Sequence, residues 1–336
     1  MIVAKVLKRT GILLLLVLVL INFALFNYGR QLLEPVDYNL TQTDKLVEIE
    51  PNTSINRIGK MLYQKGLIRS PFIFRIYLRV KDLSTGVQAG HYKLNSGMST
   101  PEIIDKLVRG ETADYTITVF EGARVEQIAD LLAREGVDRD KFLGLARHKK
   151  LDFLPERDDV KYNLEGFLYP NTYRIPYGSS ERDVIRIMVN EFKRQVNFLE
   201  EQIEDSDYDL YEIVTIASLI EGERKVASEE PLIASVIYNR LEIGMRLQLD
   251  ATVQYSLPEH KSRLLYRDLE VDSPYNTYKI SDLPPGPINN PSLSAMRSAL
   301  NPAETDYLYY VATTGGYHEF TRTYQEHLEV QRGLNN

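Results

Sequence analysis

The stretch "LYEIVTIASLIEGERK", Leu210 to Lys225, is the most apolar helical pattern in the chain outside its N-terminus. Its first part, Leu210 to Ile220, predicts a helix whose apolar stripe includes Val214 and Ala217. Glu221 follows Ala217 by four positions and Val214 by seven, so it falls on the same stripe. A carboxylate therefore stands where the pattern predicts Ile or Leu.

The composition limits the classes of protein that fit. A chain of 336 residues, 43% hydrophobic and 26% charged, is long enough for two or more domains. Its net charge of -7 argues against a nucleic-acid partner, which favours a basic face. There is no cysteine, and the five histidines show no HExxH spacing. We therefore expect no metal site and no cofactor, and the sequence has no P-loop, GxGxxG turn or GxSxG elbow.

An apolar run, Gly11 to Phe26, lies close to the N-terminus. Its length is near the lower limit of about 17 residues for a spanning helix. A cleaved signal peptide is the alternative, but no small-residue cleavage site follows the run. The sequence thus predicts an uncleaved, single-pass anchor at residues 10–28. Basic residues precede it, which predicts a cytoplasmic tail at residues 1–9 and an extracytoplasmic remainder; they are Lys5, Lys8 and Arg9.

Two segments of the chain resemble each other position by position. Val47 to Ile68 and Ile117 to Asp138 each predict a short strand, a polar turn and an amphipathic helix, with Gly66 and Gly136 placed to end the helices. One interpretation is two small α+β packing units. The other is a resemblance to LysM-type glycan-binding modules, which share this strand–turn–helix opening.

Further elements complete an α+β fold. Residues 89–94, "AGHYKL", predict a strand, and the next helix is expected to begin with Thr100 as its N-cap. Two later helices are predicted, one from Arg182 to about Gln202 and one after Ser228, which we expect to cap it. Leu247 to Leu257 predicts alternation or turns, residues 273–292 an ordered loop, and the segment around Gly315 and Gly316 a hairpin that leads into a short helix.

These patterns give a domain division after the anchor. Residues 29–45 are interpreted as a linker, and residues 46–112 as a LysM-like subdomain. Residues 113–175 hold the second strand–turn–helix unit and a connection. The remainder, residues 176–336, is interpreted as an α+β domain that carries the Glu221 helix.

Several segments together resemble a known family. The segment Ala217 to Tyr255, followed by "SPYNTY", "LPPGPINNP" and "YLYYVA…GGYHEF", is similar to the YceG-like (MltG) endolytic murein transglycosylases. The family's motif (A)S-[IL]-[VI]-E-x-E carries its catalytic glutamate at the first Glu, which is Glu221 in this chain. Two departures are present: Gly222 stands where a longer residue is usual, and Asn171 stands where an Asp is common.

The resemblance implies a membrane-anchored enzyme of the cytoplasmic membrane. It would cleave the MurNAc–GlcNAc bond inside nascent peptidoglycan strands and leave 1,6-anhydroMurNAc ends, with cell-wall synthesis enzymes as partners. It further implies that one glutamate serves both as acid and as base. Burial against apolar side chains disfavours the charged form of a carboxyl group, and the stripe predicts such surroundings for Glu221. The alternative for Glu221 is a structural salt bridge with Arg224, Lys225 or Arg240.

Other polar residues in the family-like segments are candidates for substrate binding. Asp250 is the candidate second carboxylate, because a helix turns Glu223 away from Glu221. The predicted substrate-binding residues are Asn239, Arg240, Gln248, Asp250, Tyr255, Asn276 and Thr277. The alternative role of each of these side chains is structural, namely to hold a loop in place. Two other functions remain open: a muramidase that uses Glu221, Asp250 and water, and a non-catalytic wall-binding scaffold.

Overall fold

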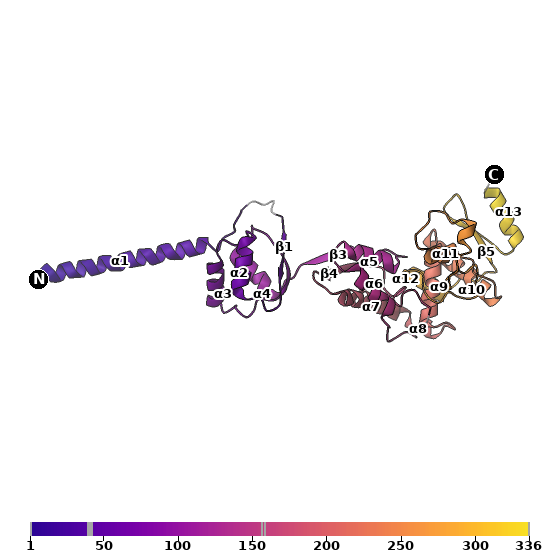
Figure 1. Cartoon of the computed structure of the whole chain (residues 1–336), viewed down its shortest axis with the longest axis horizontal. Helices are drawn as coiled ribbons and strands as arrows, with labels where there is room; N and C mark the ends of the chain where they lie inside the picture. The colour runs from indigo at the N-terminus through magenta and orange to yellow at the C-terminus, as the bar shows by residue number, and fades with distance from the viewer. Residues whose placement is uncertain (1, 39–42, 156, 158, 335–336) are drawn as a thin grey trace. The chain divides into compact units, whose positions relative to one another are not determined.

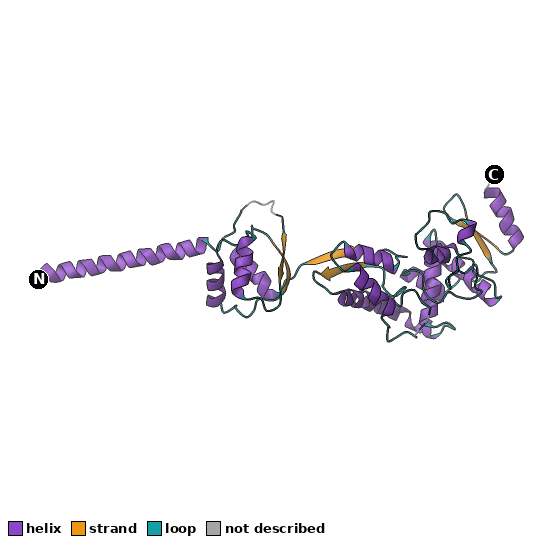
Figure 2. Ribbon diagram, in the orientation of Figure 1, coloured by secondary structure: helices purple, strands orange, loops and turns teal. Residues whose placement is uncertain are grey.

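The computed structural model describes residues 2–38, 43–155, 157 and 159–334 (Figure 1). The chain forms two compact units. The first comprises Met1–Tyr115 and Pro176–Gly178, and the second comprises Thr116–Ile175 and Ser179–Asn336. Helices and three two-stranded sheets are mixed in the described chain (Figure 2). The structure thus confirms the predicted mixture of helices and strands.

Helix α1, Ile2–Gln31, contains the apolar run near the N-terminus. Its part from Gly11 to Gln31 contains an 18-residue stretch with a mean hydropathy of 2.4, and none of that stretch is buried against the rest of the chain. A helix of this length and composition fits either a membrane span or a signal sequence.

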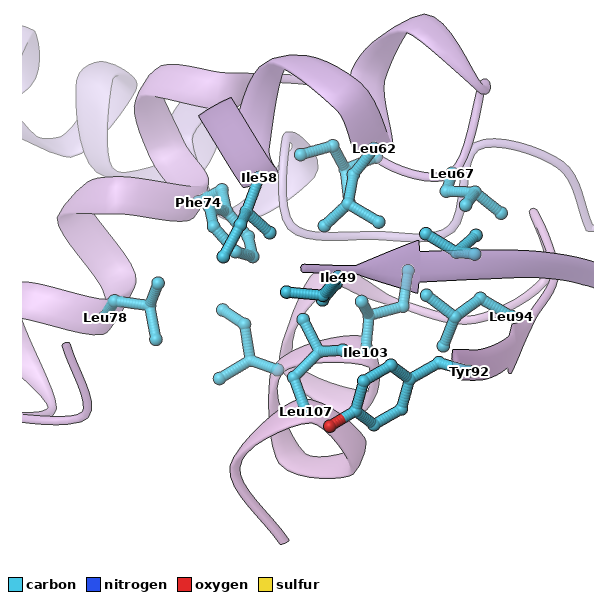
Figure 3. Packing of buried hydrophobic residues seen from close by; sticks show 13 residues of the cluster. Ile49, Ile58, Leu62, Leu67, Phe74, Leu78, Tyr92, Leu94, Ile103 and Leu107 are labelled. Carbon is cyan, nitrogen blue, oxygen red and sulfur yellow. The ribbon is translucent and has the colours of Figure 1, made fainter. Parts of the chain in front are cut away.

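The first unit is built on a two-stranded antiparallel sheet. Strands β1, Lys45–Ile49, and β2, Gly90–Leu94, pair with Val47 opposite Tyr92. Three helices supply the rest of the core: α2 Ile55–Gln64, α3 Pro71–Val80 and α4 Thr100–Arg109. Their buried apolar side chains meet those of the strands in one cluster (Figure 3). Every buried member of this cluster comes from residues 47–107, and none of the described side chains of α1 belongs to it.

Helix α4 begins one residue earlier than the sequence predicted. Its N-cap is Ser99, whose side chain accepts a hydrogen bond from the backbone N–H of Glu102. The Glu102 carboxylate accepts in return from the N–H and hydroxyl of Ser99. This reciprocal pair of hydrogen bonds satisfies backbone N–H groups at the start of the helix. Thr100, the predicted cap, is instead the first helical residue.

The predicted internal repeat is present. In the second copy, β3 Asp114–Thr118 is followed by α5 Val125–Ala133, as β1 is followed by α2 in the first. The two helices end in turns of the same kind. Leu67 N–H donates to the carbonyl of Leu62 at 2.9 Å, and Val137 N–H donates to that of Leu132 at 3.2 Å. Gly66 and Gly136 take the positive φ that this turn requires, 67° and 90°.

The second unit opens with the second repeat copy. Strand β3 pairs with β4, Thr172–Pro176, and the chain passes between the two units through these strands. Helix α5 is followed by α6, Arg139–His148, and then by α7, Glu181–Val196. A 3-10 turn, Asn197–Leu199, and the short α8, Glu200–Glu204, come next, so the long helix predicted to reach Gln202 is broken at Asn197.

Helix α9, Leu210–Glu223, is the centre of the second unit. It is buried on nearly all sides by α10 Glu230–Glu242, α11 Asp250–Ser256 and α12 Leu293–Leu300. Two sequence predictions are wrong in this region. The N-cap of α10 is Glu229, because residues 227–229 form a 3-10 turn, and Ser228 does not cap the helix. Residues 250–256 form a helix instead of alternating.

The C-terminal elements follow the sequence prediction. Strands β5, Tyr309–Ala312, and β6, His318–Thr321, form an antiparallel hairpin around the two glycines. Helix α13, Tyr324–Leu334, follows it. The loop from residue 273 to 292 contains no helix or strand, as its Pro, Gly and Asn content predicted.

Candidate active site

Glu221 lies in the last turn of α9, and its side chain is 3% exposed. The Oε1 atom accepts a hydrogen bond from Nε of Arg224 at 2.8 Å and forms an ion pair with Nη2 of the same residue at 2.6 Å. The Oε2 atom accepts from the backbone N–H of Ser292 at 2.9 Å. The carboxyl group is therefore held in one orientation by donors from two separate segments.

Arg224 binds three carboxylates at once. Besides Glu221, it donates to Glu230 Oε1 at 2.9 Å and to Glu121 Oε2 at 2.8 Å. Glu230 is fully buried, and its second oxygen accepts from the hydroxyls of Ser294 and Ser298. Of the three salt-bridge partners that the sequence offered for Glu221, the structure selects Arg224. The surroundings of Glu221 are thus more polar than its apolar stripe predicted.

Two short segments are linked directly beside Glu221. Gly122 N–H donates to the carbonyl of Asn290, and Asn290 N–H donates to that of Ala123, both at 2.9 Å. Gly122 has a φ of 74°, and a Cβ there would lie 3.4 Å from Cγ of Glu221. The turn that opens the second repeat copy therefore packs against the carboxyl-bearing side chain of α9.

A buried carboxyl group, Glu165, supports this link. Its Oε1 accepts from the N–H of Val125 at 3.0 Å and from Nδ2 of Asn290 at 3.3 Å. Its Oε2 accepts from the hydroxyl of Tyr255 at 3.1 Å. Complete burial raises the pKa of Glu165 to about 8. Glu165 thus joins α11, the Gly122 turn and the Asn290 loop behind the site.

Glu221 faces a cleft of about 690 Å³ in the second unit, here called the Glu221 cleft. Its floor contains Gly222, Ala251 and Gln254, and its walls include Arg124, Lys161 and His260. An adjoining pocket of about 540 Å³, the Asp250 pocket, shares those three floor residues. The two hollows therefore continue each other across the end of α9 and the start of α11.

The Asp250 pocket is lined by two carboxyl groups of its own, those of Glu223 and Asp250. Glu223 accepts from the N–H of Ala251 at 3.1 Å and from the hydroxyl of Tyr310 at 3.2 Å. Asp250 accepts from the hydroxyl of Tyr278 at 2.7 Å. Burial raises the pKa of Glu223, and the charge of Asp250 adds to the effect. Because Glu223 lines this pocket and Glu221 lines the cleft, the two glutamates serve different hollows, as the helical spacing predicted.

Three of the seven predicted substrate-binding residues line the Asp250 pocket: Arg240, Gln248 and Asp250. The segment "LQLDATVQY" borders both hollows, as predicted, but "SPYNTY" contributes only Tyr278 to the Asp250 pocket. Gln248 adopts a φ of 48°, which is uncommon for a residue other than glycine and occurs often at functional sites.

The other four predicted residues bind other parts of the chain. Asn239 donates to the carbonyls of Thr305 and Tyr307, and Asn276 donates to those of Leu269 and Val271. The other two are buried, with Tyr255 bonded to Glu165 and Thr277 accepting from the N–H of Leu249. None of these four side chains borders either hollow. These bonds hold loops together, and a substrate-binding role for the four residues stays a prediction.

Sequence reasoning missed several groups around Glu221. Glu121 and Glu230 complete the carboxylate set of Arg224, and the N–H of Ser292 is a backbone donor. No sequence signal marks a backbone N–H far along the chain. Among the described residues, no group of three or more His, Asp or Glu side chains is arranged to hold a metal ion.

The fold and this site define a class of protein with known members. Residues 47–333 match the YceG-like family, and the chain belongs to this family. It is 38% identical to an endolytic murein transglycosylase of Bacillus subtilis (strain 168), over 90% of this chain and 88% of that protein. A protein of the same name from Streptococcus pneumoniae (strain ATCC BAA-255 / R6) is 30% identical, over 85% of this chain and 57% of its own length.

A solved structure is also similar. It is the 2.6 Å crystal structure of a yceG-like protein from Listeria monocytogenes, with a TM-score of 0.61 and 34% sequence identity. The similarity covers 86% of this chain and 100% of the crystallised one. The resemblance of the sequence to this family is thereby confirmed.

Proposed function

We propose that this chain is an endolytic murein transglycosylase, a lyase that cleaves the MurNAc–GlcNAc bond of peptidoglycan strands. Membership of the YceG-like family and the names of its relatives support this function. The observation that carries the proposal is Glu221 itself. It is a nearly buried carboxyl group that borders an open cleft and is held by Arg224 and Ser292.

In the first step, Glu221 donates a proton to the glycosidic oxygen, and the bond from that oxygen to the anomeric carbon breaks. Within the described residues, Oε2 accepts one hydrogen bond, from Ser292, so it keeps a lone pair that can carry the proton. The carboxylate that results is stabilised by Arg224 and by the Ser292 N–H. Because both donors are already in position, this stabilisation requires no rearrangement.

In the second step, the same carboxylate accepts the proton of the primary hydroxyl of the muramic acid. That hydroxyl oxygen bonds to the anomeric carbon and closes the 1,6-anhydro ring. The carboxyl group returns to its starting form, and no water is consumed. A separate nucleophile, which a retaining hydrolase needs, has no role here.

The continuity of the two hollows supports cleavage inside a strand. The Glu221 cleft and the Asp250 pocket meet at Gly222, Ala251 and Gln254, so a strand can extend in both directions from Glu221. In the Asp250 pocket, Arg240, Gln248 and Asp250 offer donors and acceptors for sugar hydroxyl and N-acetyl groups. Tyrosine faces are suited to stack on sugar rings, and Tyr278, Tyr309 and Tyr310 border this pocket.

Helix α1 is proposed to anchor the protein in the cytoplasmic membrane, with its N-terminus inside and both units outside. The apolar part, Gly11 to Gln31, is long enough to span a bilayer. The site would then act on nascent strands near the membrane and limit their length, with wall-synthesis enzymes as partners. The repeat copies are proposed as LysM-like glycan-binding units, and residues 46–112, 113–175 and 176–336 as the domains behind the anchor.

The test is digestion of purified glycan strands by the full-length protein in detergent, followed by mass spectrometry. A lyase gives internal fragments with anhydro ends. A muramidase gives reducing ends, which are heavier by one water. A scaffold binds sacculi and releases no fragments. Either of the last two results would contradict the proposal.

A further inference from the structure

Helix α3 presents an apolar stripe to solvent on the first unit. Phe74 and Leu78 are fully buried in the core, whereas Phe72, Ile76 and Val80 are 58%, 38% and 76% exposed. The exposed three are spaced by four residues, so they form one continuous row along the helix. The solvent-facing side of a surface helix is usually polar, whereas that of this ten-residue helix carries a row of large apolar residues.

The charged residues of α3 itself, Arg75 and Arg79, are both basic. From Arg69 to Lys81 the chain contains four basic residues and no acidic one. Arg75 and Arg79 lie on the exposed side next to the apolar row, since each follows or precedes a row member by one or three positions. An apolar face flanked by arginines is characteristic of helices that lie in the interface of an anionic bilayer.

The start of α3 is tied to the end of α1. Arg69, which directly precedes the N-cap Ser70, donates to the carbonyl of Pro35 from Nε at 2.8 Å and from Nη2 at 2.6 Å. Leu33 accepts at 2.8 Å from the N–H of Thr100, the first residue of α4. Pro35 is only four residues beyond Gln31, where α1 ends, so the two lie within about 14 Å of each other.

This short connection places a limit on where α3 lies. The polar interface of a bilayer extends roughly 5–7 Å beyond the hydrocarbon core on each side. If Gln31 is at the membrane surface, the N-terminus of α3 is within reach of that interface. A protein partner or a glycan has no such connection to α3, whereas the proposed membrane span ends four residues before Pro35, which Arg69 binds.

We propose that Phe72, Ile76 and Val80 dock on the outer leaflet of the membrane that α1 spans, with Arg75 and Arg79 on anionic phospholipid headgroups. The inference rests on the proposed anchor. Docking adds a second attachment to the membrane, so the first unit lies on the bilayer surface instead of hanging from one helix. The ligand is thus an anionic lipid surface, and its recognition uses no residue of the Glu221 cleft.

The chain has no Trp, so one introduced Trp reports on a single position. The full-length Phe72→Trp variant is reconstituted into vesicles of equal parts phosphatidylglycerol and phosphatidylcholine, with or without brominated acyl chains. Because an interfacial helix buries its apolar face by about 5–10 Å, we expect brominated lipid to lower the emission by about twofold or more. Arg75→Glu with Arg79→Glu in the same variant is expected to restore most of the emission.

The matched control is Leu46→Trp. Leu46 is an exposed apolar residue of the same unit, 43% exposed. On β1 it points away from the face of Val47, which is buried under the helices. Its emission is expected to be the same with and without bromine.

Flotation of each variant with the vesicles after a carbonate wash reports on the anchor separately. Chains that float but show no quenching at position 72 would overturn the docking and leave the anchor intact. Chains that do not float would overturn both. Shielding of position 72 only when glycan strands are added would assign the stripe to glycan and also overturn the docking.

Discussion

The backbone N–H of Ser292 donates a 2.9 Å hydrogen bond to Oε2 of Glu221, which precedes it by 71 residues. Ser292 is also the N-cap of α12, and its side chain accepts from the N–H of Ala295. One residue therefore begins α12 and orients the carboxyl group. The positive end of the α12 dipole therefore lies beside the group that bears negative charge between the two steps of the proposed mechanism.

Glu221→Gln is predicted to abolish cleavage while preserving the fold. The amide retains the shape of the side chain but cannot donate a proton to the leaving oxygen. General acid–base catalysis contributes about 10²–10⁴-fold, and one group serves both steps here, so the loss should reach the upper end. The measurement is anhydro-end formation by mass spectrometry, alongside thermal melting.

Glu121→Gln is the matched control for that variant. Glu121 also binds Arg224, but its side chain is largely exposed and outside the proposed chemistry. Both variants should melt close to the wild type, since Arg224 keeps two of its three carboxylates in each. Only Glu221→Gln should lose activity, and equal losses in the two variants would contradict the assignment.

Arg224→Met is predicted to lower both stability and activity. Glu230 and Glu221 would remain as buried carboxylates without their cation. Removing one partner of a buried ion pair costs about 3–5 kcal/mol, which urea unfolding would measure. Adding Glu230→Gln should recover much of that stability because one buried charge is gone. Activity should stay about 10²–10³-fold low in the double variant, because the forming carboxylate lacks its donor; recovery of both would make Arg224 purely structural.

Glu165 is predicted to make stability fall as pH rises. Its pKa is about 8 in the folded protein against an ordinary value of 4.5, so the folded chain binds this proton more tightly than the unfolded chain does. The contribution is fully present below about pH 4.5 and is lost as pH rises through about 8. Melting temperatures measured from pH 5 to 9 should therefore fall less steeply for Glu165→Gln than for the wild type. Parallel pH profiles for the two proteins would remove Glu165 as the cause.

Local patterns predicted those parts of the fold that depend on nearby residues. The stripe of α9, the two repeat copies and the terminal hairpin all follow from periodicity and from glycines at turns. Helix α11 escaped prediction because it has only seven residues and no capping side chain at its start. The N–H of Ala251 is satisfied by Glu223, 28 residues earlier, and such a contact leaves no local signal.

For the site too, features that are local in sequence could be predicted and contacts between distant residues could not. Glu221 is predicted as the catalytic residue from a carboxylate on an apolar stripe and from family resemblance, both of which are local in sequence. Its orientation depends on Ser292 and on Arg224, and one further partner of Arg224, Glu121, is 103 residues away from it. Asn276 and Thr277 are predicted sugar contacts because they are polar residues in a loop; nothing in the sequence indicated that both are buried and bonded within the chain.

Gly222, where the family usually has a longer residue, is predicted to be required by the packing of α9 on α11. A Cβ at Gly222 would lie 2.8 Å from Cβ of Ala251, which has no freedom to rotate away. Overpacking of this kind costs about 1–3 kcal/mol, more than the gain of up to about 1 kcal/mol from placing Ala in a helix. We therefore expect Gly222→Ala to lower the free energy of unfolding and to reduce activity, because Gly222 and Ala251 both line the floor of the cleft.

Gly144→Ala provides the opposite expectation in the same unit. Gly144 also lies inside a helix, α6, but no atom lies within 4 Å of a Cβ built there. That variant should gain about 0.5–1 kcal/mol from helix propensity alone.

Ala251→Gly in the Gly222→Ala background removes the clashing atom, so the two changes should be less destabilising together than the sum of each alone. Urea unfolding of the wild type, Gly222→Ala, Ala251→Gly and the double variant measures this coupling. Purely additive effects, or stabilisation by Gly222→Ala, would show that α11 moves freely away from α9 and that the contact does not set the shape of the cleft.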